Sequence, residues 1–326
     1  MKDKMQKIST DTCQVEYKSA TENKLGGQTF MGMTENNFTN IEQANYGLLE
    51  MILSPLNLNK AYKQVKSNQG SGGVDGLGVD ELLPYLHKHK EELIQLIING
   101  RYKPNPVRRV EIPKTSGKTR LLGIPTVVDR FIQQAIAQTL SPIYEPQFSD
   151  YSYGFRPHRG AHDALKQCQA YISEGYGYAV DMDLEKYFDT VNHSKLIEVL
   201  SRTIKDGRVV SLIHKYLNAG VMTAGQYMET PMGVPQGSPL SPLLSNIMLN
   251  ELDLELANRG HKFVRYADDC MILCKSQRAA ERTLSHILPF IEDKLYLKVN
   301  RDKTVVSHVK DVKFLGYGFY IKSGEG

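Results

Sequence analysis

The stretch FVRYADDCMILC, residues 263–274, places two adjacent carboxylates, Asp268 and Asp269, in the middle of an apolar run. Val264 and Met271 are side chains that favour burial. Unpaired carboxylates in such surroundings would cost several kcal/mol. The acidic pair therefore either lies in a tight hairpin turn that is open to water or binds a cation.

A second acidic cluster lies upstream, in AVDMDLEKYFD, residues 179–189. Asp181 and Asp183 are two residues apart on a predicted strand, so their side chains point to the same face, whereas Val180 and Met182 point to the other. If the two acidic strands lie side by side, their carboxylates form an oxygen-only site that suits Mg²⁺. Two such ions support an in-line phosphoryl displacement. The alternative is that each pair is solvated at a turn or strand edge.

Positive charge is concentrated in residues 101–120, which are predicted to contain a β-hairpin. The segment has a single acid, Glu111, and seven basic residues: Arg101, Lys103, Arg108, Arg109, Lys114, Lys118 and Arg120. A basic strip of this kind attracts phosphates. Lys114 and Arg120 lie on opposite arms of the predicted hairpin, where together they could bind one polyphosphate. The alternative is a solvated basic face, above all for Lys103, Arg108 and Lys118.

A third segment, MGVPQGSPLSPLLSN at 232–246, is interrupted repeatedly by proline and glycine. Gly237 would let a ligand approach the backbone closely, and Gln236 offers an amide for contacts. Taken alone, the segment is a loop that leads into a long helix starting near Ser241.

The bulk composition narrows the protein class. The chain has 326 residues, 41% of them hydrophobic and 23% charged, with a net charge of +4, as is ordinary for a soluble globular protein of one large domain or two lobes. The four cysteines are scattered without a CxxC pair, which indicates reduced thiols. No stretch approaches the ~18 apolar residues of a membrane span. We therefore expect no membrane association and a cytoplasmic location.

Taken together, these segments resemble a known family. YADD, DLEKYFD upstream, PQGSPLSPLLSN between them and PKTSGKTRLLGIPTVVDRFIQQ before them are similar to reverse transcriptases. The combination of LGIP, FRPHRGAHDAL, PQGSPLSPLL and RYADD resembles the group II intron-encoded maturase/reverse transcriptases, from about residue 45 to 320. Several blocks in the right order are far more specific than YADD alone.

The resemblance implies an α+β fold with the right-hand polymerase architecture of fingers and palm, in which an antiparallel palm sheet is backed by helices. Residues 1–44 would be a polar N-terminal tail, 45–175 the fingers with an N-terminal lid at the glycine-rich loop 69–80, and 176–326 the palm. No thumb follows the palm in this sequence, and the palm edge left open could drive self-association into a homodimer.

The resemblance also implies site residues. Asp183, rather than Asp181, matches the first catalytic aspartate, and it would hold two Mg²⁺ ions with Asp268, Asp269 and the backbone carbonyl of Leu184. Phe188 matches the steric gate that selects dNTPs; otherwise it would be a core aromatic. Residues matched to binding of the incoming nucleotide and the nascent base pair are Lys114, Arg120, Gln236 and Gly237.

Further matches are more peripheral. Lys303, in NRDKT, matches a lysine proposed to protonate the leaving pyrophosphate. Arg265 and Tyr266 would flank the catalytic turn near the primer end. Contacts with template phosphates are expected from Arg156, His158 and Arg159. His158 and His162 have metal-ligand spacing, but no third ligand is nearby.

The expected function is that of a bacterial RNA-directed DNA polymerase that copies group II intron RNA from a DNA primer with dNTPs, and that binds the intron RNA as a splicing maturase. One alternative is a reverse transcriptase from a retron, a diversity-generating element or a CRISPR locus. A second is a non-catalytic splicing cofactor that binds intron RNA. A third is an RNA-dependent RNA polymerase, against which Phe188 argues.

Overall fold

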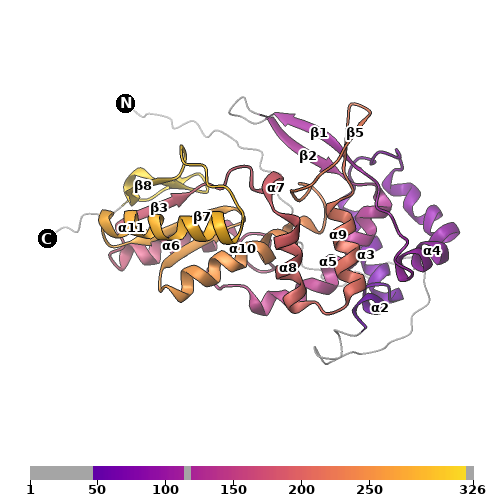
Figure 1. Ribbon diagram of the computed structural model, residues 1–326, viewed down its shortest axis with the longest axis horizontal. Helices are drawn as coiled ribbons and strands as arrows, with labels where there is room; N and C mark the ends of the chain where they lie inside the picture. Colours follow the sequence, from indigo (N-terminus) through magenta and orange to yellow (C-terminus); the bar gives the residue numbers. More distant parts are fainter. Residues whose placement is uncertain (1–46, 114–118, 321–326) are drawn as a thin grey trace, which may run out of the picture.

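The computed structural model describes residues 47–113 and 119–320. Within them the chain forms an elongated body, with a four-stranded sheet towards one end and a group of helices at the other (Figure 1). The expected α+β fold class is confirmed. The predicted N-terminal tail at 1–44 lies outside the described residues.

The sheet has the strand order β6–β7–β3–β8, and every neighbouring pair is antiparallel. The strands are β6 (Lys262–Tyr266), β7 (Asp269–Cys274), β3 (Tyr178–Met182) and β8 (Val305–His308). β6 and β7 form the hairpin that the opening stretch predicts. Since β3 pairs with β7, the two acidic segments lie on neighbouring strands, as expected.

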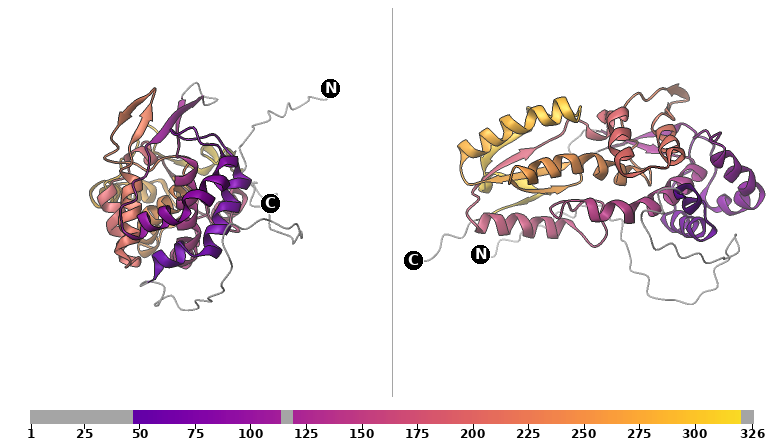
Figure 2. Two further views of the ribbon diagram at one scale, coloured as in Figure 1. Left: turned by 90° about the vertical axis from the view of Figure 1, so that its right-hand side faces the viewer. Right: turned by 60° about the horizontal axis from the view of Figure 1, so that its bottom comes forward.

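Helices cover both faces of this sheet. α6 (Ala161–Ser173) packs on one face, and α10 (Ser241–Asn258) and α11 (Gln277–Pro289) pack on the other (Figure 2). Strand alternation divides the buried side chains between two cores: Ala179 and Met271 join the α6 side, whereas Val180 and Ile272 join the larger core under α10 and α11. The predicted antiparallel sheet backed by helices is therefore confirmed.

A second sheet has the order β2–β1–β4–β5. Its strands are β1 (Val107–Pro113), β2 (Thr119–Ile124), β4 (Val221–Thr223) and β5 (Gln226–Met228). β1 and β2 are the predicted basic hairpin. β4 runs parallel to β1. The sequence did not indicate this pairing, and it joins a short hairpin from the second half of the chain to the first half.

The remaining elements build the helical end and the connections. The helices are α2 (Leu48–Ile52), α3 (Pro55–Asn68), α4 (Leu82–Ile98), α5 (Val127–Tyr144), α7 (Tyr187–Thr190), α8 (His193–Thr203) and α9 (Gly207–Leu217). Short helical turns lie at Val79–Glu81, Glu145–Gln147, Phe290–Lys294 and Val309–Asp311, and β9 (Lys313–Phe314) pairs with β10 (Tyr317–Gly318). α5 is buried on most of its surface, so the other helices pack around it.

One buried carboxylate ties the helical end together. The Asp206 side chain accepts hydrogen bonds from the Leu49 amide of α2 (3.2 Å) and from the Arg208 amide at the start of α9 (3.1 Å). Arg208 also pairs with Glu50. Burial alone would raise the pKa of Asp206, but the Arg208 guanidinium, which donates to Asp206 Oδ2 (2.8 Å), outweighs it together with the two amides and lowers the pKa.

We expect Asp206→Asn to lower the free energy of unfolding by about 1–2 kcal/mol at pH 7, since the ionised oxygen is a helix cap and a paired charge. The pKa of Asp206 is lower in the folded protein than in the unfolded chain, where it is about 3.9, so the ionised carboxylate stabilises the fold above that pH. This stabilisation is lost as the pH falls through the folded-state pKa. Urea unfolding should therefore show a gap between wild type and variant that shrinks from pH 7 to pH 3. Glu91→Gln, at a side chain that is 74% exposed, is the control and should leave stability unchanged.

Two further expectations can be compared with the described residues. Within 47–113 and 119–320, no helix combines the length and apolarity that crossing a membrane would require. Among the described residues, Cys168, Cys270 and Cys274 are buried free thiols, which agrees with the reduced thiols expected from their scattered positions.

Candidate active site

The paired carboxylates lie at the end of the first sheet. Ala267 and Asp268 form the turn between β6 and β7, Asp269 is the first residue of β7, and Ala267 has the left-handed φ of +56°. Met182 of β3 is opposite Cys270 of β7. One residue further along this register, Asp183 comes beside Asp269, so the structure brings the three predicted carboxylates to one edge.

Burial and electrostatic repulsion among the carboxylates at this edge raise the pKa values of Asp181, Asp268 and Asp269. Burial, followed by the charges of Asp268, Asp181 and Asp183, raises the pKa of Asp269 to about 6. Burial also raises the pKa of Asp268, with Asp183 adding to the rise and Arg120 opposing it. The pKa of Asp181 is raised by burial and by Asp183. The four carboxylates repel one another in partly buried surroundings, so a positive charge bound among them would stabilise their ionised forms.

Lys303 supplies one such charge directly. Its Nζ lies 3.1 Å from Oδ2 of Asp183. The loop that carries Lys303 is attached to the same aspartate, because the Asn300 amide donates to the Asp183 carbonyl (2.9 Å) and the Asp183 amide donates to the Thr304 hydroxyl (3.2 Å). The structure therefore places Lys303 in the candidate site, where the sequence predicted it.

The backbone carbonyl of Leu184 fits the role of a ligand. Leu184 forms an antiparallel bridge with Val299, in which the flanking residues make the hydrogen bonds: the Asn300 amide with the Asp183 carbonyl, and the Glu185 amide with the Lys298 carbonyl. In such a pair the amide and carbonyl of the central residue point away from the partner strand. The Leu184 carbonyl thus remains available to a ligand.

Carboxylate and carbonyl oxygens are the donors that Mg²⁺ prefers, so the chemistry of the site fits this ion. Among the residues that the structure describes, no three His, Cys, Asp or Glu side chains are close enough together to hold a metal as they stand. One of the candidate carboxylates, that of Asp183, is paired with Lys303.

The basic hairpin and the Pro/Gly loop meet beside these acids. Arg120 Nε donates to Gln236 Oε1 (2.7 Å), and the Gly123 amide donates to the Gln236 carbonyl (2.7 Å). Gly237 has a φ of +105°, and a Cβ there would come within 2.9 Å of the Gly123 carbonyl oxygen, so this position requires glycine. Three of the predicted binding residues are thus brought together. The fourth, Lys114, lies outside the described residues.

Phe188 lies against the same loop. Its side chain is 7% exposed and packs edge-on against Tyr187, with ring centroids 5.2 Å apart. Its carbonyl accepts a hydrogen bond from the Val234 amide (2.6 Å). Phe188 is therefore a core aromatic at the border of the candidate site, and its role as a steric gate stays a prediction.

Two of the predicted arginines are buried. Arg265 flanks the catalytic turn, as expected, but its side chain is fully buried and paired with Asp253, and its place near the primer end stays a prediction. Arg156 was expected to contact template phosphates, but it is 7% exposed and bonded to Glu145 and to the Ser152 carbonyl. The prediction for Arg156 is wrong, because its side chain is used within the protein.

The neighbouring basic residues differ in exposure. Arg159 is paired with Asp150, lies over the Tyr153 ring, and has a side chain that is 25% exposed. His158 is exposed and has a left-handed φ of +59°. The expected contacts of these two residues with template phosphates stay predictions.

The glycine-rich loop 69–80 is attached to the start of the basic hairpin. Arg108 donates from two nitrogens to the Gly72 carbonyl (2.8 and 3.1 Å), and Arg130 donates to the Ser71 carbonyl (2.7 Å). A Cβ on Gly73 would come within 2.5 Å of the Thr126 backbone, so the loop packs there backbone to backbone. Arg108 is thus not a solvated charge, which was one alternative for it. The role of the loop as a lid stays a prediction.

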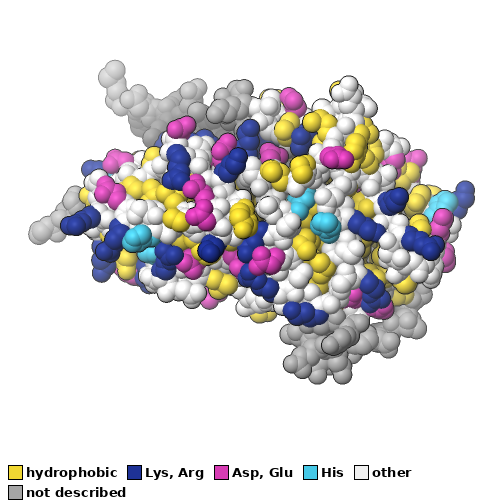
Figure 3. Space-filling view, in the orientation of Figure 1, with side chains coloured by type: hydrophobic (Ala, Val, Ile, Leu, Met, Phe, Trp, Pro, Cys, Tyr) yellow, Lys and Arg dark blue, Asp and Glu magenta, His cyan; other side chains and the backbone are white. Residues whose placement is uncertain are grey.

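Exposed apolar side chains lie on and beside the second sheet. They gather over β1 and β5 on the face shown in Figure 3. Those exposed by half or nearly so are Ile112, Tyr227 and Met228 on the sheet and Met232, which follows β5 in the chain. Arg109 lies on the same sheet, 3.9 Å from Asp189, which follows Phe188 in the chain. Apolar and aromatic side chains beside arginine form a surface suited to stacking on bases.

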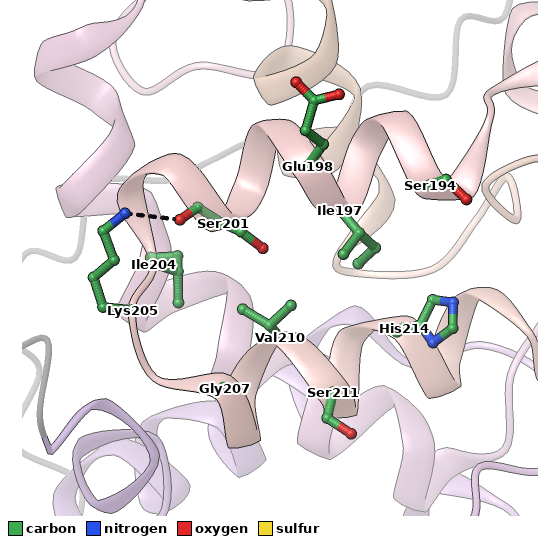
Figure 4. A pocket seen from close by; sticks show the side chains of 10 residues that line it. All are labelled: Ser194, Ile197, Glu198, Ser201, Ile204, Lys205, Gly207, Val210, Ser211 and His214. Atoms are coloured by element: carbon green, nitrogen blue, oxygen red, sulfur yellow. Dashed lines mark hydrogen bonds between the residues drawn. The ribbon is translucent and has the colours of Figure 1, made fainter.

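A separate hollow of about 730 Å³ lies between α8 and α9 (Figure 4). It is lined by polar and apolar side chains, among them Ser194, Glu198, Ser201, Ser211 and His214. Lys205 Nζ donates to the Ser201 carbonyl at one end (3.0 Å). None of the predicted site residues lines this hollow, so it is not part of the candidate active site.

Sequence reasoning missed three residues behind the catalytic turn, two of them polar. Asn246 and Asp253 of α10 are buried, and Gly154 touches the backbone of Ala267. The sequence did contain a signal: Asn246 and Asp253 are seven residues apart, so they share one face of a helix that also buries many apolar side chains. Polar side chains at core positions are informative because burying them is costly unless they are paired.

Comparison with known proteins agrees with this geometry. The family model described as "Reverse transcriptase (RNA-dependent DNA polymerase)" matches residues 112–319. Protein YkfC of Escherichia coli (strain K12) is 35% identical over 311 residues, which cover 83% of this chain and 82% of that protein. Group II intron-encoded protein LtrA of Lactococcus lactis subsp. cremoris is 32% identical over 356 residues, covering 89% of this chain and 59% of that protein.

A structural comparison supports the same fold. The structure of telomerase from Candida tropicalis in complex with a fragment of telomeric RNA aligns with a TM-score of 0.50 and 16% identity. The alignment covers 71% of this chain and 47% of that one. This likeness concerns the fold alone. The resemblance to group II intron-encoded proteins, expected from the sequence, is confirmed by the similarity to LtrA.

Proposed function

Since this chain belongs to the reverse transcriptase family, we propose that it is an RNA-directed DNA polymerase that extends a DNA primer with dNTPs on an RNA template. The observation that carries the proposal is the convergence of Asp183, Asp268 and Asp269 at one sheet edge, with Arg120 acting on the charge of Asp268. Carboxylates and a nearby arginine are the parts that phosphoryl transfer requires.

Two Mg²⁺ ions would be held by Asp183, Asp268, Asp269 and the Leu184 carbonyl, and they would lower the pKa of the primer 3′-hydroxyl and neutralise the triphosphate. The residues of the chain bind and orient the reactants. Arg120, held by Gln236, would bind the triphosphate together with Lys114. Gln236 and Gly237 would support the nascent base pair, since their loop is fixed to Gly123.

Lys303 would act as a general acid. Its ammonium group is paired with Asp183, and this contact would orient the Nζ towards the reacting phosphates. The Nζ of Lys303 would then be placed to donate a proton to the pyrophosphate that leaves. The pairing thus supports a role for Lys303 within the site.

Residues 45–175 would form most of the fingers and residues 176–326 most of the palm. The β4–β5 hairpin joins the fingers sheet through β1, so one piece of the second segment would work with the fingers. The docked glycine-rich loop would lie over the template strand, with Arg108 and Arg130 holding it at its base.

The similarity to LtrA, a group II intron-encoded protein, supports intron RNA as the template and a second role as a splicing maturase. The exposed apolar surface on β1 and β5 offers a place for unpaired bases. Binding of intron RNA by the purified chain, measured by filter retention at several salt concentrations, should be tighter than binding of an unrelated RNA of equal length. Equal affinity for both RNAs would argue against the maturase role.

Primer extension tests the polymerase itself. The purified chain should extend a labelled DNA primer on an RNA template with dNTPs and Mg²⁺, whereas Asp268→Ala should add no nucleotide while keeping its circular dichroism spectrum. If folded wild-type chain fails to extend the primer, or if Asp268→Ala extends it equally well, the proposed function is wrong for this chain.

The steric gate gives a prediction about substrate choice. Phe188→Ala should raise the incorporation of rNTPs relative to dNTPs by about 10²-fold or more, because the truncated side chain no longer collides with a ribose 2′-hydroxyl. The ratio of kcat/KM for the two substrates is the measurement. Tyr187→Phe, which keeps the ring but removes the hydrogen bond from its hydroxyl to the Ser245 carbonyl, is the matched control. An unchanged ratio in Phe188→Ala would remove Phe188 from the gate.

A further inference from the structure

The turn that carries Asp268 and Asp269 is not held by its own sequence. Its first residue, Ala267, has a left-handed φ of +56°, a conformation that residues with a Cβ rarely adopt. A turn of this kind keeps a single geometry only where its surroundings determine it. The contacts of Ala267 therefore show what fixes the two carboxylates.

The first contact is a backbone approach from Gly154. A Cβ built on Gly154 would lie 2.2 Å from the Ala267 nitrogen and 3.0 Å from its Cα. The segment before Gly154 runs along β6, since the Tyr153 amide donates to the Arg265 carbonyl (2.9 Å) and the Arg265 amide donates to the Tyr151 carbonyl (2.9 Å). Position 154 thus admits only glycine while the turn stays where it is.

The second contact comes from a buried guanidinium. Arg265 NH1 donates to the Ala267 carbonyl (2.8 Å) and to Asn246 Oδ1 (3.0 Å). Its other nitrogens donate to both carboxylate oxygens of Asp253 (2.7 and 2.6 Å), and both side chains of this ion pair are fully buried. A planar guanidinium held in this way has no rotational freedom left.

Asn246 links Gly154 to Arg265. Its Nδ2 donates to the Gly154 carbonyl (2.9 Å), and its Oδ1 accepts from Arg265. Four residues, Gly154, Asn246, Arg265 and Ala267, therefore form one closed cycle of contacts, which Asp253 anchors to α10. An ion pair of this kind is a weak source of stability, because apolar side chains of similar volume often stabilise as well or better. What apolar side chains cannot supply is a donor for the Ala267 carbonyl.

We propose that Gly154, Asn246 and Arg265 are positioning residues that hold the Ala267–Asp268 turn in the geometry needed for nucleotide addition. This inference rests on the proposed polymerase function. The three residues do not touch substrate; they act through the turn. Displacement of a catalytic group by about 1 Å can reduce a rate by about 10²-fold, so a loosened turn should affect the chemical step and leave nucleotide binding intact.

The kinetic test compares Asn246→Ala and Gly154→Ala with wild type in single-nucleotide addition. We expect kcat to fall by about 10²-fold in each variant while KM for the dNTP changes by less than about threefold. Leu86→Ala, in the buried face of α4, is the control, because it should lower the melting temperature without lowering kcat. A kcat within about threefold of wild type in Asn246→Ala would overturn the inference, as would an equal loss of kcat in Leu86→Ala.

Amide hydrogen exchange adds a readout that needs no activity. Exchange of the amides of residues 267–269 should be at least about tenfold faster in Asn246→Ala than in wild type, whereas exchange in the distant helix α4 should be unchanged. If wild type extends no primer, the polymerase proposal fails, and hydrogen exchange still decides whether the closed cycle of contacts holds the turn. Unchanged exchange at 267–269 would show that it does not.

Discussion

Asp269→Asn should abolish primer extension and at the same time make the metal-free protein more stable. Extension should fall by at least about 10³-fold, because one of the three carboxylates at the sheet edge no longer carries charge for the cations. The gain in stability follows from the repulsion in the site, since burial and the charges of Asp268, Asp181 and Asp183 raise the pKa of Asp269 to about 6. Although its surroundings raise its pKa, the Asp269 side chain itself reaches solvent at the start of β7, so solvent screening limits the gain to about 1–3 °C in melting temperature.

The sign of the pH dependence follows from the same pKa. A carboxyl whose pKa is raised in the folded state binds its proton more tightly there than in the unfolded chain, so its ionisation destabilises the fold as the pH rises through 6. The stability advantage of Asp269→Asn should therefore be largest near pH 7–8 and vanish near pH 4. Thermal unfolding in EDTA measures it, with Asp311→Asn as a surface control. A variant less stable than wild type at pH 7 would contradict the described electrostatics.

The second large effect concerns the buried ion pair of Arg265 and Asp253. Asp253→Ala should cost about 3–5 kcal/mol of unfolding free energy, because it leaves a fully buried guanidinium without its counter-charge. The double variant Asp253→Leu with Arg265→Met should recover most of this loss, since apolar side chains of similar volume then fill the space. Urea unfolding of the single and double variants measures both values.

The double variant also distinguishes the contribution of the ion pair to protein stability from the role of Arg265 in holding the turn. It should remain at least about 10²-fold slower than wild type in nucleotide addition, because methionine offers no donor to the Ala267 carbonyl. Recovery of both stability and rate would show that the ion pair serves the fold alone. Recovery of neither would show that the apolar pair does not fit the space between β6 and α10.

Local patterns were sufficient to predict the elements that carry the site. Alternating apolar residues around Asp181 and around Asp268 indicated two strands, and the structure pairs them as β3 and β7. The same alternation could not choose between Asp181 and Asp183, because both point to one face. The structure distinguishes them by place: Asp181 lies inside β3 opposite Met271, whereas Asp183 follows the strand end and meets Lys303.

Long-range contacts explain what the sequence could not predict. No local pattern pairs Arg265 with Asp253, or Arg156 with Glu145 and the Ser152 carbonyl, so the sequence did not show that these two side chains are buried. The parallel pairing of β1 with β4 joins residues more than a hundred positions apart, and no local pattern specifies it. The burial of Arg265 was nonetheless indicated in part, since it shares a strand face with Phe263, whose side chain belongs to the core under α10.

The metal-dependent polymerase site is tested most directly by counting the cations bound at Asp183, Asp268 and Asp269. The chain would be bound to an RNA template and a dideoxy-terminated DNA primer with the matching dNTP, and bound Mn²⁺ would be measured by electron paramagnetic resonance. We predict about two more ions per wild-type complex than per complex of Asp183→Asn, because Asp183, Asp268 and Asp269 would hold both. Equal numbers of bound ions in the two complexes would contradict the claim that these three aspartates form one metal-dependent polymerase site.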